Sequence, residues 1–270
     1  MKASVRYFSG TGNSWRIALE CAERFRAAGY AIDMESIRAA APPDPAADAA
    51  AFCFPTHALD LPRNAVAYLR GLPAAARPTP ALLLVTGGHD DNCGWSIETG
   101  VRLLAERGYP VRFGELISMT TNWTPFHSTP DDDEVGRMIE VALQKADSCA
   151  DRFIAGESRI KPICLRRFGA VGSTVLRTLY HRRGVYQLWK FFEVGSRCNG
   201  CGLCARQCPT DSIRMKDGKP VWSGGCVQCM RCFNYCPRRA IRQMEFLLHG
   251  SRHRAHKLKE FNPAAERNTA

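Results

Sequence analysis

Apolar and polar positions follow two different rhythms over the first 155 residues. Short apolar runs alternate with longer stretches in which apolar residues recur at helical spacing, and this alternation predicts parallel strands joined by helices. The stretches with helical spacing predict helices over Asn13–Ala28, Ile97–Arg107 and Glu134–Ile154. The apolar runs predict strands at Ser4–Phe8, Ala31–Ser36, Ala50–Phe54, Ala81–Thr86 and Val111–Met119.

Five strands alternating with helices predict an α/β fold of the doubly wound type. We expect a parallel five-stranded sheet of order 2-1-3-4-5, with helices on both faces. The proline-rich stretch Ala39–Ala50 reads as a loose connection. Cys21, Cys53 and Cys149 fall on apolar faces of the predicted elements, so we expect them in the core.

The pattern changes after residue 155, which divides the chain into four segments. Residues 1–155 form the sheet domain and 156–195 a basic connector of helical pattern. Residues 196–245 form a small α+β domain dense in cysteine, and 246–270 a basic, polar tail. Polar chain ends are the usual place for disorder, so we expect this tail to be flexible.

Eight of the thirteen cysteines lie in an internal repeat. Cys198–Pro209 and Cys226–Pro237 both read C-x2-C-x2-C-x3-C-P, at an offset of 28 residues. In such a run, three closely spaced cysteines bind one [4Fe–4S] cluster and the fourth reaches the cluster of the other half. A zinc site needs only four ligands and fits two such runs poorly. The predicted ligands are Cys198, Cys201, Cys204 and Cys236 for cluster I, and Cys226, Cys229, Cys232 and Cys208 for cluster II. The segment resembles bacterial two-cluster ferredoxins.

A second motif joins the first predicted strand to the first helix. The sequence Ser-Gly-Thr-Gly-Asn-Ser offers hydroxyl groups, glycines and a helix N-terminus, which together can cradle a phosphate. It lacks the lysine of a P-loop and the spacing of a dinucleotide fingerprint. It resembles the flavodoxin phosphate loop, and this resemblance implies that it holds the 5′-phosphate of FMN. The residues concerned are Ser9, Gly10, Thr11, Gly12, Asn13 and Ser14. The alternative is a simple helix-capping turn without a ligand.

Two further loops should border the flavin, because a doubly wound sheet binds its ligand at the carboxyl ends of the strands. Flavodoxins place aromatic side chains beside the flavin ring, and here His57 and Trp95 are the candidates for those places. Asn122 and Trp123 follow the fifth strand at the same edge, where they either bind or only pack. The predicted flavin-bordering residues are Pro55, Thr56 and His57 in one loop, and Thr86, Gly87 and Gly88 in the other.

The net charge of +11 is unevenly distributed. Residues 1–155 hold 15 Lys and Arg against 19 Asp and Glu, whereas residues 156–270 hold 22 against 7. A basic half raises nucleic acid or a membrane surface as partners. We expect neither, because each oxidised cluster with its four thiolates carries about −2 and offsets part of this charge. Without a signal peptide or an apolar run of membrane length, we expect a cytoplasmic protein.

The order of the segments resembles the flavodoxin–ferredoxin fusion proteins of anaerobic bacteria and archaea. The resemblance implies an electron-transfer iron–sulfur flavoprotein that passes electrons between FMN, two [4Fe–4S] clusters and external redox proteins. Two alternatives stay open: a flavin-dependent reductase of a small substrate such as a quinone, and a redox sensor associated with a membrane or nucleic acid. A carrier is favoured over an enzyme because the sequence shows no evident acid–base pair.

Overall fold

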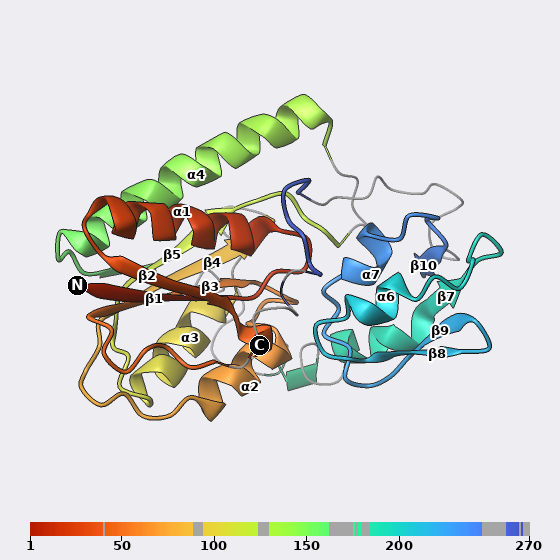
Figure 1. Ribbon diagram of the computed structural model, residues 1–270, viewed down its shortest axis with the longest axis horizontal. Helices are drawn as coiled ribbons and strands as arrows, with labels where there is room; N and C mark the ends of the chain where they lie inside the picture. Colours follow the sequence, from red (N-terminus) through yellow and green to blue (C-terminus); the bar gives the residue numbers. More distant parts are fainter. Residues whose placement is uncertain are drawn as a thin grey trace.

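The structure is a computed structural model. It describes residues 1–39, 41–88, 94–123, 130–161, 175, 178–179, 184–244, 258–264 and 266. Figure 1 shows two units side by side along the long axis of the molecule. We call residues 1–160 the sheet unit and residues 192–243 the iron–sulfur unit.

The sheet unit is built on a parallel sheet of order β2-β1-β3-β4-β5-β6. The first five strands confirm the predicted order 2-1-3-4-5. The sixth, β6, is only two residues long and pairs with β5 through Phe113 and Arg159. It lies beyond residue 155, the predicted end of this domain. The strands are β1 (Lys2–Tyr7), β2 (Ala31–Ser36), β3 (Ala49–Pro55), β4 (Ala81–Gly87), β5 (Val111–Ser118) and β6 (Arg159–Ile160).

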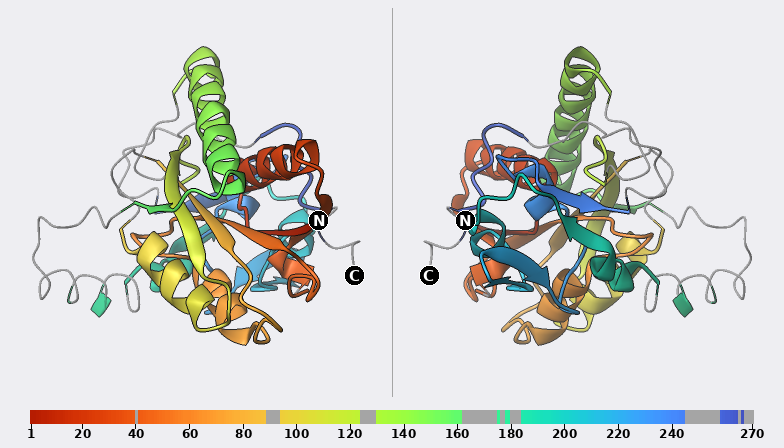
Figure 2. Two further views of the ribbon diagram at one scale, coloured as in Figure 1. Left: turned by 90° about the vertical axis from the view of Figure 1, so that its left-hand side faces the viewer. Right: turned by 90° about the vertical axis from the view of Figure 1, so that its right-hand side faces the viewer.

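Helices cover both faces of this sheet. Figures 1 and 2 show α1 and α4 on one face and α2 and α3 on the other. Strands β3 and β4 lie between the two layers and are buried almost throughout, which explains their unbroken apolar runs. The prediction did not include α2, a short helix that buries only Ala65 and Leu69. The helices are α1 (Asn13–Ala27), α2 (Arg63–Gly71), α3 (Ser96–Ala105) and α4 (Asp132–Ile154).

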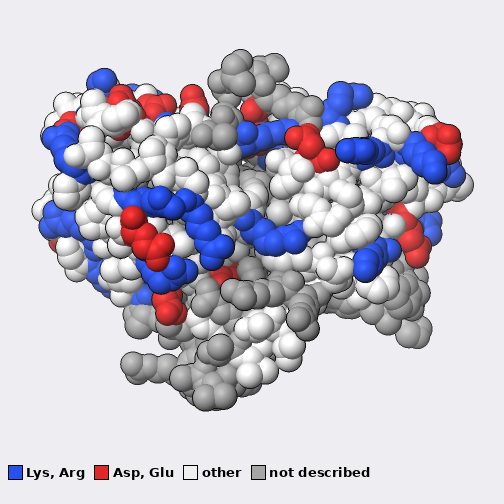
Figure 3. Space-filling view, turned by 90° about the horizontal axis from the view of Figure 1, so that it is seen from below, with Lys and Arg blue, Asp and Glu red and all other residues white. Residues whose placement is uncertain are grey.

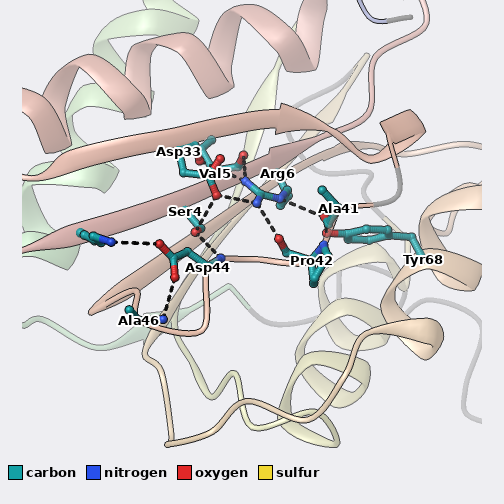
Figure 4. A network of polar contacts seen from close by, with 10 residues as sticks. Ser4, Val5, Arg6, Asp33, Ala41, Pro42, Asp44, Ala46 and Tyr68 are labelled. Atoms are coloured by element: carbon teal, nitrogen blue, oxygen red, sulfur yellow. Dashed lines mark hydrogen bonds and ion pairs between the residues drawn. The ribbon is translucent and has the colours of Figure 1, made fainter. Parts of the chain in front are cut away.

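A buried arginine ties down the stretch that we expected to be a loose connection. Arg6 of β1 is 2% exposed and forms an ion pair with Asp33 of β2, at 2.6 Å. Its guanidinium also donates to the carbonyl oxygens of Ala41, at 3.1 Å, and Pro42, at 2.6 Å (Figure 4). A buried guanidinium needs such acceptors, and the connection supplies them. The part of the connection that the structure describes is therefore fixed to the sheet.

The iron–sulfur unit is small and irregular, with short antiparallel strands. Strand β7 pairs with β10, and β8 pairs with β9. Two short helices, α6 and α7, each begin one residue before the third cysteine of a repeat. This arrangement confirms the predicted α+β class. The elements are β7 (Phe192–Val194), α6 (Leu203–Arg206), β8 (Ile213–Lys216), β9 (Lys219–Trp222), α7 (Arg231–Asn234) and β10 (Ile241–Gln243).

The predicted helical connector falls mostly outside the described residues. Its described end forms a 3-10 helix at Val185–Phe191. Of the tail, for which we expected flexibility, the structure describes residues 258–264 and 266. Leu258 and Phe261 are buried, and the Phe261 ring lies 5.5 Å from that of Trp15 on α1. These two apolar side chains pack into the core on the α1 face of the sheet. Within the described ranges, no helix combines the length and the apolar character that crossing a membrane requires.

Candidate functional site

The predicted phosphate loop lies between β1 and α1, and hydrogen bonds fix its shape. Gly12 precedes the helix with a φ of 114°, a conformation that favours glycine, and its N–H donates to Ser9 Oγ at 3.0 Å. Asn13 Nδ2 donates to the carbonyl of Thr120, at 2.7 Å. The hydroxyls of Ser14 and Thr86 share a hydrogen bond of 2.7 Å. The loop is therefore anchored to the ends of β4 and β5.

A polar cleft opens at this edge of the sheet. The cleft brings together the phosphate loop and both of the predicted bordering loops. Of the twelve predicted residues, only Gly12 is missing from its lining. A Cβ on Gly12 would instead lie 2.8 Å from Cβ of Leu258 in the tail. The lining residues are Ser9, Gly10, Thr11, Asn13, Ser14, Pro55, Thr56, His57, Thr86, Gly87, Gly88, Met119, Thr120, Thr121 and Asn122.

The fifth-strand segment Met119–Asn122 is the part of the lining that the prediction missed or left open. The rule that placed the other loops at the carboxyl edge applies equally to the end of β5, so the signal was present. Trp95 does not line the cleft as the described residues define it; it is buried at the start of α3. His57 does line it, and its Nδ1 lies 3.0 Å from the carbonyl oxygen of Val227. That contact requires the proton on Nδ1.

The eight repeat cysteines surround two separate cavities in the iron–sulfur unit. The structure brings them together in the predicted groups, with the fourth cysteine of each run placed at the cavity of the other half. Their roles as ligands stay a prediction. The first cavity is lined by Cys198, Cys201, Cys204 and Cys236, and the second by Cys208, Cys226, Cys229 and Cys232. We call them cavity I and cavity II.

The backbone conformation around the cysteines also repeats between the two copies. Gly200 and Gly202 adopt left-handed conformations in the first copy. The equivalent residues 28 positions later, Gln228 and Met230, adopt the same conformation although neither is glycine. This costs roughly 1–2 kcal/mol at each non-glycine residue. The second copy therefore keeps the loop shape at a cost in stability, which indicates that the loop shape itself is required.

The thiols at cavity II are unfavourable places for bare negative charge. Burial raises the pKa of Cys226 to about 12 and that of Cys229 to about 11. Backbone N–H groups point at one sulfur of each cavity: Ser212 N lies 3.3 Å from Cys208 Sγ at cavity II, and Ala240 N lies 3.2 Å from Cys236 Sγ at cavity I. Cys226 and Cys229 therefore become thiolates only beside strong positive charge, which bound iron would supply.

The spacing of the cysteines argues against a single metal ion. Among the residues that the structure describes, no group of three or more His, Cys, Asp and Glu side chains converges as one ion requires. Each set of four sulfurs is instead spread around a cavity. A zinc ion needs four ligands at about 2.0–2.3 Å from one point, whereas a cubane cluster accepts one thiolate at each of four separated corners. The donor set fits [4Fe–4S] clusters.

Side chains from the sheet unit hold the backbone around cavity II. Four of them, at the carboxyl edge of the sheet, donate to carbonyl groups of the cysteine-bearing loops. The contacts are Arg38 Nη2 to Cys208 O at 2.7 Å, Arg63 Nη2 to Cys226 O at 2.8 Å, His57 Nδ1 to Val227 O at 3.0 Å, and Asn122 Nδ2 to Cys229 O at 3.3 Å. The sequence gives no sign of these contacts, because they join residues more than 100 positions apart.

Arg231 crosses the boundary between the two units from the other side. It stands between Met230 and the cavity II cysteine Cys232, and it is fully buried. Its guanidinium donates to the carbonyls of Gly10, at 3.0 Å, and Ser9, at 2.5 Å. It also pairs with Glu266 of the tail, at 2.8 Å. One side chain thus touches the phosphate loop, cavity II and the tail.

Comparison with known proteins supports the division into two units. Residues 197–241 match the family model of the 4Fe-4S dicluster domain, which confirms the predicted two-cluster iron–sulfur module. A search of the curated proteins found no match. The chain thus joins a 4Fe-4S dicluster domain to a doubly wound sheet of flavodoxin-like strand order.

Among solved structures, the similarity covers slightly more than half of this chain. A flavodoxin of Streptococcus pneumonia TIGR4 is 18% identical, over 55% of this chain and 99% of its own, with a TM-score of 0.36. Flavodoxin 2 of Bacillus cereus is 19% identical over 57% and 100%, with a TM-score of 0.39. An azoreductase of Bacillus anthracis str. Sterne is 14% identical over 57% and 100%, with a TM-score of 0.40. The strand order, rather than these likenesses, defines the topology.

Proposed function

We propose that this protein is an electron-transfer iron–sulfur flavoprotein, with FMN in the cleft at the sheet edge and one [4Fe–4S] cluster in each cysteine-lined cavity. One observation carries the proposal: the cleft and cavity II share a wall. Arg231 lines cavity II and donates to Ser9 and Gly10, which line the cleft. Because electron-transfer rates fall steeply with distance, two redox centres at these places are well positioned to exchange electrons.

The cleft suits a phosphorylated flavin. The hydroxyls of Ser9, Thr11 and Ser14 are buried in its wall, and the N-terminus of α1 adds a positive end. Gly87 and Gly88 leave room for a flat ring at the end of β4. Bound there, FMN supplies both one-electron and two-electron chemistry, whereas each cluster exchanges one electron. The residues of the cleft would bind and orient the cofactor.

Anaerobic purification followed by metal and flavin analysis tests the proposal. We expect roughly eight iron atoms, as two four-iron clusters require, and about one FMN per chain. A redox titration should then show flavin and clusters accepting electrons in the same preparation. Stoichiometric zinc without iron, or fully loaded clusters in a chain that does not bind FMN, would contradict the proposal.

A pair of matched variants locates the flavin. Thr11→Val removes one hydroxyl from the cleft, and we expect it to weaken FMN binding about tenfold, the loss of one hydrogen bond of ~1.4 kcal/mol. Thr79→Val makes the same change at a buried threonine whose hydroxyl donates to the carbonyl of Arg77. It should leave FMN binding unchanged. Equal effects of the two variants would place the flavin elsewhere.

A further inference from the structure

We propose that cavity I is the port at which an acidic one-electron carrier protein docks, and that cavity II is the internal relay to the cleft. The inference rests on the proposed function, because it assumes clusters in both cavities and a flavin in the cleft. It assigns different roles to two halves that the sequence repeat makes look equivalent. Three observations separate the halves: their contacts with the sheet unit, their exposure and the charge around them.

Cavity II is closed off by the sheet unit. Cys208, Cys229 and Cys232 are each less than 10% exposed. The contact is so close that a Cβ added to Gly10 would lie 2.3 Å from the carbonyl oxygen of Cys229. This close contact, together with the four side chains at the sheet edge that donate hydrogen bonds to the loops of cavity II, leaves no room for a protein partner between cavity II and the cleft. A cluster in cavity II exchanges electrons mainly with its neighbours inside the molecule.

Cavity I faces the opposite way. Cys201 is exposed, and the loop around it packs against the β8–β9 hairpin, where a Cβ on Gly200 would lie 2.9 Å from the carbonyl oxygen of Gly218. Met215 and Pro220 of the same hairpin line the cavity. In Figure 1, α7 lies toward the sheet, whereas β8 and β9 lie at the far end of the molecule. A partner at this end can reach a cluster directly.

The surface around cavity I is basic. Arg238 lines the cavity, and four further exposed cations lie within two residues of lining residues in the sequence. We call these five cations the basic rim: Arg197, Arg206, Lys216, Lys219 and Arg238. Arg206 Nη1 donates to the carbonyl of Cys201, at 2.9 Å. Within the described part of the chain, Arg197, Arg206 and Arg238 form no ion pair with an acidic side chain. Seen from below in Figure 3, the iron–sulfur unit on the right shows more Lys and Arg than Asp and Glu.

Two lysines of the rim oppose each other on either side of a hairpin turn that carries the exposed Asp217. Lys216 and Lys219 are direct cross-strand partners in the β8–β9 hairpin, and like charges in such positions repel. Offsetting the charge of the clusters would not require this pairing, because one lysine with a neutral partner would avoid the repulsion. A surface that attracts an acidic protein accounts for both positions, since complementary charge steers encounter and fixes orientation.

The electron balance is simple and runs in either direction. Each reduced carrier gives one electron at cavity I and leaves oxidised by one electron. Two such deliveries, relayed through cavity II, reduce one FMN with two protons from solvent. Two reduced carriers, FMN and two protons thus become two oxidised carriers and FMNH2. In the reverse direction, FMNH2 reduces two oxidised carriers and releases two protons.

Charge reversal on the hairpin tests the port. The variant Lys216→Glu/Lys219→Glu changes the rim without touching a cysteine. Its control, Arg26→Glu/Arg102→Glu, makes the same change in net charge near the C-terminal ends of α1 and α3, at the opposite edge of the sheet. Stopped-flow bleaching of the cluster absorbance follows reduction by two probes: a reduced, strongly acidic bacterial ferredoxin, and the small cation methyl viologen in its reduced form.

We expect the hairpin variant to slow reduction by the acidic ferredoxin about tenfold at low salt, and the loss to shrink as salt screens the charges. The control pair should change this rate less than twofold, and methyl viologen should not react more slowly with either variant. Equal slowing by the two pairs, rates without salt dependence, or slowing with both probes would overturn the port. The port would also be overturned if the hairpin variant lost binding to anionic vesicles while its rate of reduction by the ferredoxin stayed unchanged.

Failure of the proposed function would look different. In that case, electrons delivered by methyl viologen would bleach the clusters but would never reach a flavin, whatever the charge of the rim. If instead the flavin is reduced normally while the ferredoxin rate ignores the rim, the proposed function stands and only the port is wrong.

Discussion

The sheet unit and the iron–sulfur unit differ in what stabilises each of them. The sheet unit has a large apolar core on each face of the sheet. The core of the iron–sulfur unit has eight buried residues, two of which are Cys208 and Cys232. A unit this small cannot bury enough apolar surface to fold by itself and needs another source of stability. We therefore expect bound clusters to stabilise this unit as well as to carry electrons.

Cysteine illustrates the same contrast within one residue type. Cys21, Cys53 and Cys149 are buried in the core of the sheet unit, as predicted. There they are small apolar side chains. The eight repeat cysteines lie around the two cavities, where they can bind iron only as thiolates. Burial raises the pKa of Cys149 in the core and of Cys226 and Cys229 at cavity II, so only a ligated metal would favour their thiolates.

Removal of iron should produce the largest difference between the units. Anaerobic chelation should unfold residues 192–243 and leave the sheet unit folded, because ligand binding and folding are coupled in small metal-dependent domains. Hydrogen exchange read by mass spectrometry should show lost protection in β7–β10 and retained protection in β1 and β3. The control is the same chelator saturated with a metal beforehand. Retained protection in both units would show that the apolar core of the iron–sulfur unit suffices.

Arg231 is the residue on which the contact between the units depends most. Replacing it with methionine leaves Glu266 and two carbonyls of the phosphate loop without their buried partner. We expect a loss of about 3–5 kcal/mol of stability, as is usual when one member of a buried ion pair is removed. Chemical denaturation of the loaded protein measures it. Arg102→Met breaks an exposed ion pair with Glu106 and should cost less than about 1 kcal/mol.

Gly10 tests the close approach of the two units. Gly10→Ala places a methyl group against the carbonyl of Cys229, and overpacking of this kind costs about 1–3 kcal/mol. It should also widen the gap between the cleft and cavity II and slow electron exchange between them. Gly136→Ala is the matched change in α4, where an added Cβ meets no atom within 4 Å. That variant should gain about 0.5–1 kcal/mol. Equal effects would mean that the two units do not touch at Gly10.

The smallest expected effect concerns the thiol of Cys149 in the core of the sheet unit. Burial raises the pKa of Cys149 from 9.0 to about 11. The unfolded chain therefore loses this proton first, so stability is fully present below pH 9 and falls as the pH rises toward 11. At pH 10 the loss should be about 1 kcal/mol. Urea unfolding of the wild type and of Cys149→Ala at pH 7 and pH 10 measures it. An identical pH dependence in the two proteins would contradict this assignment.

Local patterns allowed much of this architecture to be predicted from the sequence. Apolar runs located the five main strands because that signal is local, and the repeat grouped the cysteines because two copies of one short motif can be read directly from the sequence. The short helix α2 was missed, although it is amphipathic and packs Ala65 and Leu69 into the core. The hydrogen bonds from Arg231 to the phosphate loop and the packing of Phe261 against Trp15 of α1 were also missed. These contacts join distant segments, and no local spacing encodes them.

The most direct test of electron transfer within this protein is a single-turnover measurement. The flavin is reduced by a brief light pulse in the absence of oxygen and external carriers, and cluster reduction is followed by rapid freezing and electron paramagnetic resonance. If the cleft and cavity II form one internal path, the rate of cluster reduction is independent of protein concentration. A rate proportional to protein concentration would show that electrons pass only between molecules, and would contradict the proposed function.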